Sequence, residues 1–182
     1  MKNILLIILF STAVSLTAQI YPLRTYTEIP NNTYLKDTNN ELPAYEGTWK
    51  GIWDNKILFI TFKKITNKYN ENLKYYKDNL IAKFKVLDSN GVVLFDNTFL
   101  SDDNAEIWGG KFRKADDKYS LVYIDNDLCG TSGNIRISFT DSTKTKLNWN
   151  LYFGSNMITD DCQYYYSEIP QSLPEEIILT KQ

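Results

Sequence analysis

Apolar and polar residues alternate one by one over most of this chain, and clusters of turn-forming residues interrupt the alternation about every 8–12 residues. Over residues 45–53, for example, the odd positions carry only aromatic residues and glycine, while the even positions are largely polar. Successive side chains of an extended strand point to opposite faces, so this period predicts half-buried β-strands. Many short strands with few long connections are typical of an antiparallel sandwich or barrel.

We expect an all-β fold of about nine strands, with no amphipathic helix longer than two turns. Asn90-Gly91 is a strong hairpin turn, because both residues tolerate the positive φ angles that tight turns require. Gly109-Gly110 predicts a bulge or a sharp bend within its strand. Consecutive hairpins favour an antiparallel meander that closes into a barrel, and a β-sandwich stays the alternative. The expected strands cover residues 45–53, 57–62, 80–87, 92–95, 106–113, 119–124, 134–140, 147–153 and 176–180.

The chain divides into a signal, a lead-in and one β-domain. Lys2 precedes an unbroken apolar run at 4–10, and small residues follow it, which is the layout of a secretory signal peptide over residues 1–18. A retained membrane anchor is the alternative, although the run is shorter than the roughly 20 residues that span a bilayer. Residues 19–44 hold three of the five prolines and predict an irregular lead-in, and residues 45–182 predict a single domain.

Export would place the mature protein in the periplasm or outside the cell, where thiols oxidise. Cys129 and Cys162 are the only cysteines, so we expect a disulfide between them. In the chain-entropy view, closing a loop of this size stabilises the fold by roughly 3–4 kcal/mol. A redox-active dithiol is the alternative, but the spacing is not that of a C-x-x-C motif. No segment beyond the signal is apolar enough to be expected to cross a membrane.

The absence of histidine excludes Ser-His and Cys-His catalysis and every metal site that needs an imidazole ligand. A formal net charge of −2 offers no electrostatic basis for binding nucleic acid. No motif marks a nucleophile, so we expect no enzymatic activity and no cofactor. A small hydrolase that uses two carboxylates stays an alternative, because nothing among the 22 acidic residues singles out a pair.

Two acidic loops and one group of lysines are further candidate binding sites. Asp125-Asn126-Asp127 and Asp160-Asp161 flank the cysteines, and a disulfide would bring their oxygens together as ligands for Ca²⁺. Their spacing fits no EF-hand, so we expect solvated turns and no bound metal. Lysines within residues 63–85 predict a solvated sheet face with edge-protecting charges. They are Lys63, Lys64, Lys74, Lys77, Lys83 and Lys85.

The four tryptophans are the candidate ligand-binding residues. Each brings a large apolar area and one polar N–H, which suits a cavity wall, a sugar-stacking surface or a core. Trp149 alternates cleanly with leucines and fits a core position. Trp53 and Trp108 lie beside turn residues or glycines and are the better pocket candidates, with Trp49 as a third.

The run over residues 34–51, YLKDTNNELPAYEGTWKG, is the most distinctive in the chain. Together with Tyr75–Asp78, Glu106–Gly109, the two cysteines and the ending at 177–182, it resembles a family of short exported flavobacterial proteins that carries a domain-of-unknown-function label. The resemblance implies a Gram-negative envelope or secreted location. It implies no activity.

A shorter motif, Gly47-Thr48-Trp49, resembles the Gly-x-Trp that opens the first barrel strand of lipocalins after an irregular lead-in. In that fold the tryptophan plugs the closed end of the barrel. The resemblance implies a lipocalin-like barrel and, more distantly, transport of a small ligand.

Three functions follow from these patterns. The first is an exported, non-enzymatic β-domain that binds a small hydrophobic or glycan ligand through aromatic side chains. The second is an envelope module that binds a protein partner through an exposed sheet face or a lysine- and tyrosine-rich connection. The third is the carboxylate-dependent hydrolase. A cavity lined by Trp53 or Trp108 would favour the first function, and a filled core with an exposed tyrosine-rich face would favour the second.

Overall fold

The structure is a computed structural model that describes residues 19–182, so the predicted signal peptide over residues 1–18 lies outside the described part. An all-β chain is confirmed. Its helical content in the described part is two short 3₁₀ turns, Leu42–Ala44 and Asp102–Asn104. Within residues 19–182 there is no helix with the length and apolar character needed to cross a membrane. The strands are β1 (Ile20–Pro22), β2 (Tyr34–Lys36), β3 (Gly47–Trp53), β4 (Lys56–Asn70), β5 (Tyr75–Leu87), β6 (Val93–Asp96), β7 (Ile107–Phe112), β8 (Tyr119–Asp125), β9 (Thr131–Phe139), β10 (Lys146–Phe153) and β11 (Glu176–Lys181).

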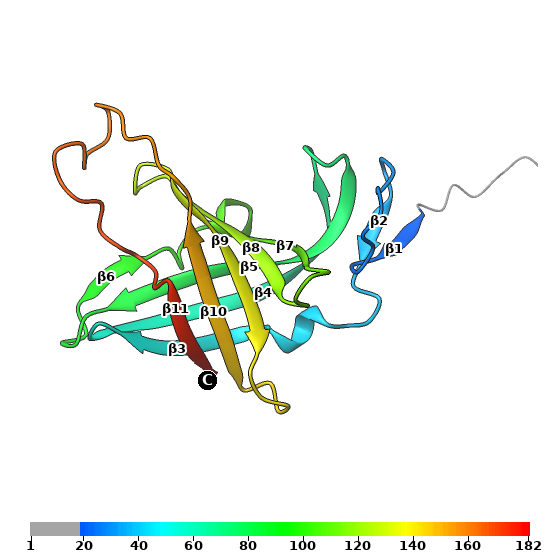
Figure 1. Cartoon of the computed structure of the whole chain (residues 1–182), viewed down its shortest axis with the longest axis horizontal. Helices are drawn as coiled ribbons and strands as arrows, with labels where there is room; N and C mark the ends of the chain where they lie inside the picture. Colours follow the sequence, from blue (N-terminus) through cyan, green and yellow to red (C-terminus); the bar gives the residue numbers. More distant parts are fainter. Residues whose placement is uncertain (1–18) are drawn as a thin grey trace, which may run out of the picture.

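Eight of these strands form a closed antiparallel barrel (Figure 1). From β3 to β11 each barrel strand pairs with the next barrel strand in the chain, with β6 set aside as an extra strand on β5. Two junctions close the ring: β5 pairs with β7 through Ile81 and Trp108, and β11 pairs with β3 through Thr180 and Lys50. The predicted meander is therefore a barrel rather than a sandwich, consistent with the lipocalin-like expectation.

Side chains fill the barrel interior. An eight-stranded barrel is just wide enough for its inward-facing residues to meet across the axis. Trp49 and Trp149 are both fully buried, and each indole N–H is satisfied by a carbonyl, Tyr45 O at 2.8 Å and Pro174 O at 3.0 Å. The alternation seen in the sequence therefore separates a packed apolar core from the barrel's outer face.

The hairpin between β4 and β5 continues beyond the barrel and curls away from it (Figure 1). The sequence predicts a long hairpin connection with extended ends over residues 66–79, and the strands do continue to Asn70 and restart at Tyr75. A bulge between Ile65 and Lys68 shifts the register at the point where the hairpin leaves the barrel. The polar stretch is therefore an exposed hairpin whose arms are extended over most of their length.

The lead-in pairs with this extended hairpin. β1 lies parallel to β2, and β2 lies parallel to β5 with Tyr34 opposite Tyr76 and Leu35 opposite Lys77. The segment that we expected to be irregular thus contains two three-residue strands. The β4–β5 hairpin and the segment over residues 19–44 together form what we call the side lobe.

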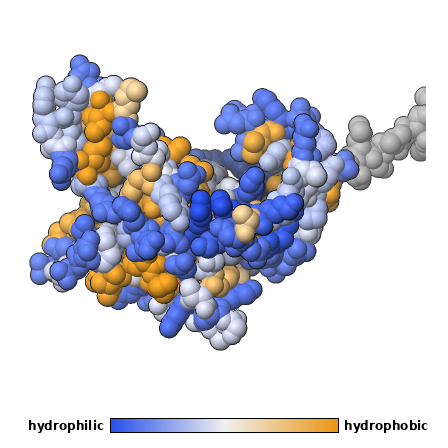
Figure 2. Space-filling view, in the orientation of Figure 1, coloured by the Kyte–Doolittle hydropathy of each residue, from blue (hydrophilic) through white to orange (hydrophobic). Residues whose placement is uncertain are grey.

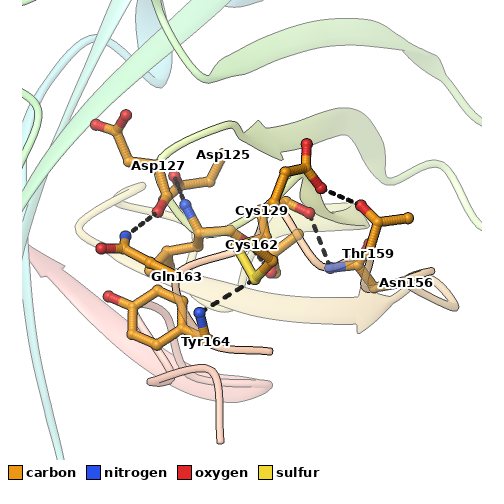
Figure 3. Close-up of a disulfide and its surroundings, with 11 residues drawn as sticks. Asp125, Asp127, Cys129, Asn156, Thr159, Cys162, Gln163 and Tyr164 are labelled. Carbon is orange, nitrogen blue, oxygen red and sulfur yellow. Dashed lines mark hydrogen bonds between the residues drawn. A yellow bond between two sulfur atoms is a disulfide. The ribbon is translucent and has the colours of Figure 1, made fainter. Parts of the chain in front are cut away.

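Cys129 and Cys162 form a disulfide with their Cα atoms 5.6 Å apart, which confirms the predicted cysteine pair (Figure 3). The bond ties the β8–β9 turn to the long connection between β10 and β11. Side-chain hydrogen bonds support the same contact: Asn156 Nδ2 donates to Cys129 O at 3.1 Å, and Gln163 Nε2 donates to Asp127 O at 3.0 Å.

Candidate ligand-binding site

A cleft of about 630 Å³ lies between the side lobe and the barrel wall. Its walls come from the lead-in, the β4–β5 hairpin and the glycine-rich segment of β7, with Leu35, Tyr75 and Trp108 among the apolar lining. The volume lies in the range of small-molecule sites. The cleft lies outside the barrel interior, because the core tryptophans Trp49 and Trp149 do not line it.

Lys77 is the unusual residue of this cleft. It lies on β5 with only 8% of its surface exposed, and it lines the cleft wall. Its Nζ donates one long hydrogen bond, 3.4 Å, to Gly109 O. Among residues 19–182, no carboxylate oxygen lies within 4.0 Å of this Nζ. The prediction of a solvated lysine is wrong at this position, because the lead-in and β7 cover the face that sequence polarity left open.

The electrostatics follow from this burial. Removal of the ammonium from water, and secondarily the positive charge of Lys111, lower the pKa of Lys77 to about 8. Lys111 is exposed and also lines the cleft, and the single carboxylate in the lining of the described part is Glu71. The cleft therefore combines an apolar wall with unbalanced positive charge.

Glycines keep the cleft wall thin. At Gly109, an added Cβ would lie 2.3 Å from Tyr119 Oη and 2.8 Å from the Leu80 backbone. At Gly110, an added Cβ would lie 2.7 Å from Ser120 Oγ, and that hydroxyl bonds both Lys111 O and Lys111 N. The register of β7 against β8 shifts in this stretch, so the predicted bulge is confirmed. Close backbone approach at the bulge sets the position of Gly109 O against Lys77.

A buried carboxylate network fixes the lead-in to strands β4 and β5. Asp78 accepts hydrogen bonds from Tyr34 Oη, Asp37 N and Asn67 N. Asp37 in turn accepts from Lys64 Nζ at 2.8 Å and from two backbone N–H groups of the Leu42–Ala44 turn and its cap. Burial acts to raise the pKa of Asp37, but the Lys64 bond and the backbone donors outweigh it and lower that pKa. These contacts hold the cleft walls in place.

The distinctive sequence run over residues 34–51 has a structural explanation here. Its first two residues, Tyr34 and Leu35, pair with Tyr76 and Lys77 in the β2–β5 ladder. The matching family model covers residues 1–182. The chain belongs to DUF6705, a family of unknown function. This confirms the resemblance to a domain-of-unknown-function family. No curated protein and no solved structure matches the chain.

The DUF6705 chain does not bring the three candidate tryptophans together. Trp108 lines the cleft, half-buried, as one of the sequence-based candidates. Trp49 lies in the barrel core, with Lys181 Nζ 5.3 Å from its ring centroid. Trp53 lies at the β3–β4 turn beside Lys56, and its Nε1 is buried with no hydrogen-bond partner in the described part. Only Trp108 shares a cavity with Lys77.

In the acidic loop before Cys129, Asp125 forms structural hydrogen bonds. Asp125 accepts from Leu128 N at 2.9 Å and from Tyr123 Oη at 2.8 Å. Glu106, in a smaller cavity of about 230 Å³ with Asp125 and Asp127, accepts from Asn97, and burial raises its pKa. Within residues 19–182, no group of three acidic or cysteine side chains is arranged to hold a metal ion.

Proposed function

We propose that this chain is an exported binding protein that holds a small amphiphile, with an apolar or aromatic body and one acidic group, in the cleft beside the barrel. The observation that carries the proposal is Lys77, a buried ammonium in the cleft wall that has no carboxylate partner among residues 19–182. A buried charge is costly unless it is paired. An acidic group on a ligand would supply the missing partner, and Lys111 would add to its attraction.

The apolar part of the ligand has a matching surface. Trp108, Tyr75 and Leu35 line the same cleft as Lys77. Burial raises the pKa of Tyr75, as expected for a phenol away from bulk water. Aromatic walls with a few convergent polar groups are the usual composition of a small-molecule site. This combination favours a hydrophobic acid over a neutral glycan, and Glu71 alone offers no carboxylate pair for hydrolysis.

Export is part of the proposal. The predicted signal peptide and the Cys129–Cys162 disulfide support a periplasmic or extracellular location. A thiol-free mass for protein recovered from a periplasmic extract, together with loss of the first 18 residues, would agree with this location. Recovery of the full-length chain with two free thiols would contradict it.

Binding can be tested with a matched pair of fluorescent probes. Anilinonaphthalene sulfonate and N-phenylnaphthylamine share an aromatic body, but only the first carries a negative charge. We expect the anionic probe to bind more tightly, and Lys77→Met to weaken its binding by about tenfold or more. The same change should leave the neutral probe within about twofold. Equal affinities of the two probes, or the same loss in the exposed control Lys146→Met, would contradict the proposal.

A protein partner is the second candidate, favoured by the exposed segment between Gly154 and Glu168. Figure 2 shows apolar surface on this projecting arm, and its most exposed large side chains are Met157 at 86% and Tyr166 at 96%. The arm carries acidic residues and no lysine or arginine, so a partner would present basic and apolar groups. Cross-linking from a photoreactive residue at Tyr166 in native envelopes tests it, with the exposed Val92 in the β5–β6 turn as the control position.

A further inference from the structure

We propose that Lys77 forms a reversible imine with ligands that carry an aldehyde or ketone, so that the cleft holds carbonyl-bearing hydrophobic acids covalently. This inference rests on the proposed function, because the ligand must first enter the same cleft. It adds a bond and a substrate class that reversible binding does not require. An amine becomes a nucleophile when it is desolvated or lies beside another cation, and both conditions hold at Lys77.

Two other partly buried lysines, on β4 and β5, differ from Lys77 in having a carboxylate partner. Lys64 is held as an ammonium by Asp37 Oδ2 at 2.8 Å. Lys83 is held by Asp102 Oδ1 at 2.9 Å and by the Leu100 carbonyl. Each therefore has a carboxylate that keeps its proton in place. Within residues 19–182, Lys77 has only the long bond to Gly109 O. Lys181 also donates to a carbonyl, Ala44 O at 3.1 Å, but it is less buried and does not line the cleft.

The position of Lys77 supplies the geometry that the reaction needs. Lys77 lines the wall of a cleft that can accommodate a small molecule, and Gly109 O at 3.4 Å is the single protein acceptor of its Nζ in the described part. The second cation, Lys111, lines the same cleft and can attract the acidic group of the ligand. With a pKa of about 8, roughly a quarter of Lys77 carries a free lone pair at about pH 7.5. An ordinary lysine has about a thousandth at that pH.

The step balances without an oxidant or reductant. The Nζ lone pair attacks the carbonyl carbon, a C–N bond forms, and the carbonyl π electrons move to oxygen, which takes up a proton. The nitrogen loses its two protons in the course of the reaction, and the oxygen leaves as water. A C=N bond to Lys77 remains, and water entering the open cleft reverses the reaction. The product is a protein-bound imine that releases the unchanged ligand.

Reductive trapping tests the inference on the intact, disulfide-bonded chain. The probe is para-carboxybenzaldehyde at a low molar ratio, with cyanoborohydride present to reduce any imine to a stable amine. Intact-mass measurement should show one addition, equal to the aldehyde less one oxygen atom, and peptide mapping should place it on Lys77. We expect trapping at Lys77 to be at least about tenfold faster than at exposed Lys146. Its rate should level off above pH 8, whereas the rate at Lys146 should continue to rise.

Three outcomes separate the inference from the function on which it rests. Fast trapping at Lys77 that benzoate suppresses supports both. Trapping at Lys77 no faster than at Lys146, while the anionic fluorescent probe still depends on Lys77, overturns the imine and leaves the binding proposal standing. If Lys77 is not trapped and the anionic probe does not depend on it, both proposals are overturned. Lys77→Arg, which keeps the charge, should retain part of the anionic-probe binding and lose all trapping at this site.

Discussion

The barrel interior and the cleft beside it lie close together and bury opposite kinds of groups. The interior holds indoles whose N–H groups are satisfied, Trp49 by Tyr45 O and Trp149 by Pro174 O. The cleft wall holds the ammonium of Lys77 with one long hydrogen bond. The first arrangement stabilises the fold and the second costs stability. Local rules are broken most often at functional sites, so this difference is why we propose the cleft, rather than the barrel interior, as the binding site.

The largest loss of stability is expected from truncating a core side chain in the barrel interior. Trp149→Ala removes a fully buried indole, and we expect the free energy of unfolding in urea to fall by about 3–5 kcal/mol. Affinity of the remaining folded protein for the anionic probe should stay within about twofold. A loss of stability below about 1 kcal/mol would show that the interior is not the stabilising region.

The opposite result is expected in the cleft. Lys77→Met should raise the free energy of unfolding at pH 7 by about 3 kcal/mol, because it removes a buried charge whose pKa is lowered from 10.5 to about 8. Between these two pH values the unfolded chain binds more protons than the folded one, so the wild type gains stability as pH rises. The difference between variant and wild type should therefore fade from pH 8 to 10.5, as chemical denaturation at several pH values can measure. A destabilised variant at pH 7 would refute the comparison.

The network that holds the lead-in against β4 and β5 should give an intermediate effect. Asp78→Asn weakens the acceptor for Tyr34, Asp37 N and Asn67 N, and we expect a loss of roughly 1–3 kcal/mol. Limited proteolysis should then cut within residues 19–44 while near-ultraviolet circular dichroism keeps the barrel signal. Asp103→Asn, which breaks only the exposed pair with Lys68, is the matched control and should change stability by about 0.5 kcal/mol or less. Equal losses of stability in the Asp78→Asn and Asp103→Asn variants would show that the buried network does not hold the lead-in in place.

Acid should act on the same network. The pKa of Asp37 is lower in the folded chain than in the unfolded one, so its contribution is complete above the ordinary carboxyl pKa. That contribution is lost as pH falls through the lower, folded value. The protection of Glu41 N and Leu42 N from hydrogen exchange, relative to the unfolded chain at the same pH, should therefore fall at acid pH before that of the barrel amides. Simultaneous loss of protection in both regions would contradict this order.

The smallest effect is expected at Trp53. Trp53→Phe removes a buried N–H that has no partner in the described part of the chain, so stability should change by less than about 1 kcal/mol. Binding of both probes should be unaffected, whereas Trp108→Ala should weaken both. Weaker probe binding in the Trp53 variant would show that Trp53 contributes to the ligand site.

Most of the barrel could be predicted because its signals are local. Alternation over a few residues marks a strand, and pairs such as Asn90-Gly91 and Gly109-Gly110 mark a turn and a bulge. The cleft could not be predicted in this way. Lys77 is buried by a lead-in about 40 residues earlier and by β7, and nothing in its own neighbourhood distinguishes it from solvated lysines. For the same reason the sequence could not tell that Trp49 lies in the core and Trp108 in the cleft. Alternation shows that a strand has two faces, but not what covers the outer one.

The unpaired ammonium of Lys77 can be tested most directly by an NMR titration of lysine side chains, followed at the carbon next to Nζ and assigned with Lys77→Arg. We predict one lysine with a midpoint at about pH 8, absent from the Arg variant. A saturating aromatic carboxylate should move that midpoint upward, since an anion beside the amine favours its charged form. A midpoint near the ordinary lysine value of 10.5, unchanged by the carboxylate, would contradict both the buried charge and the binding site built on it.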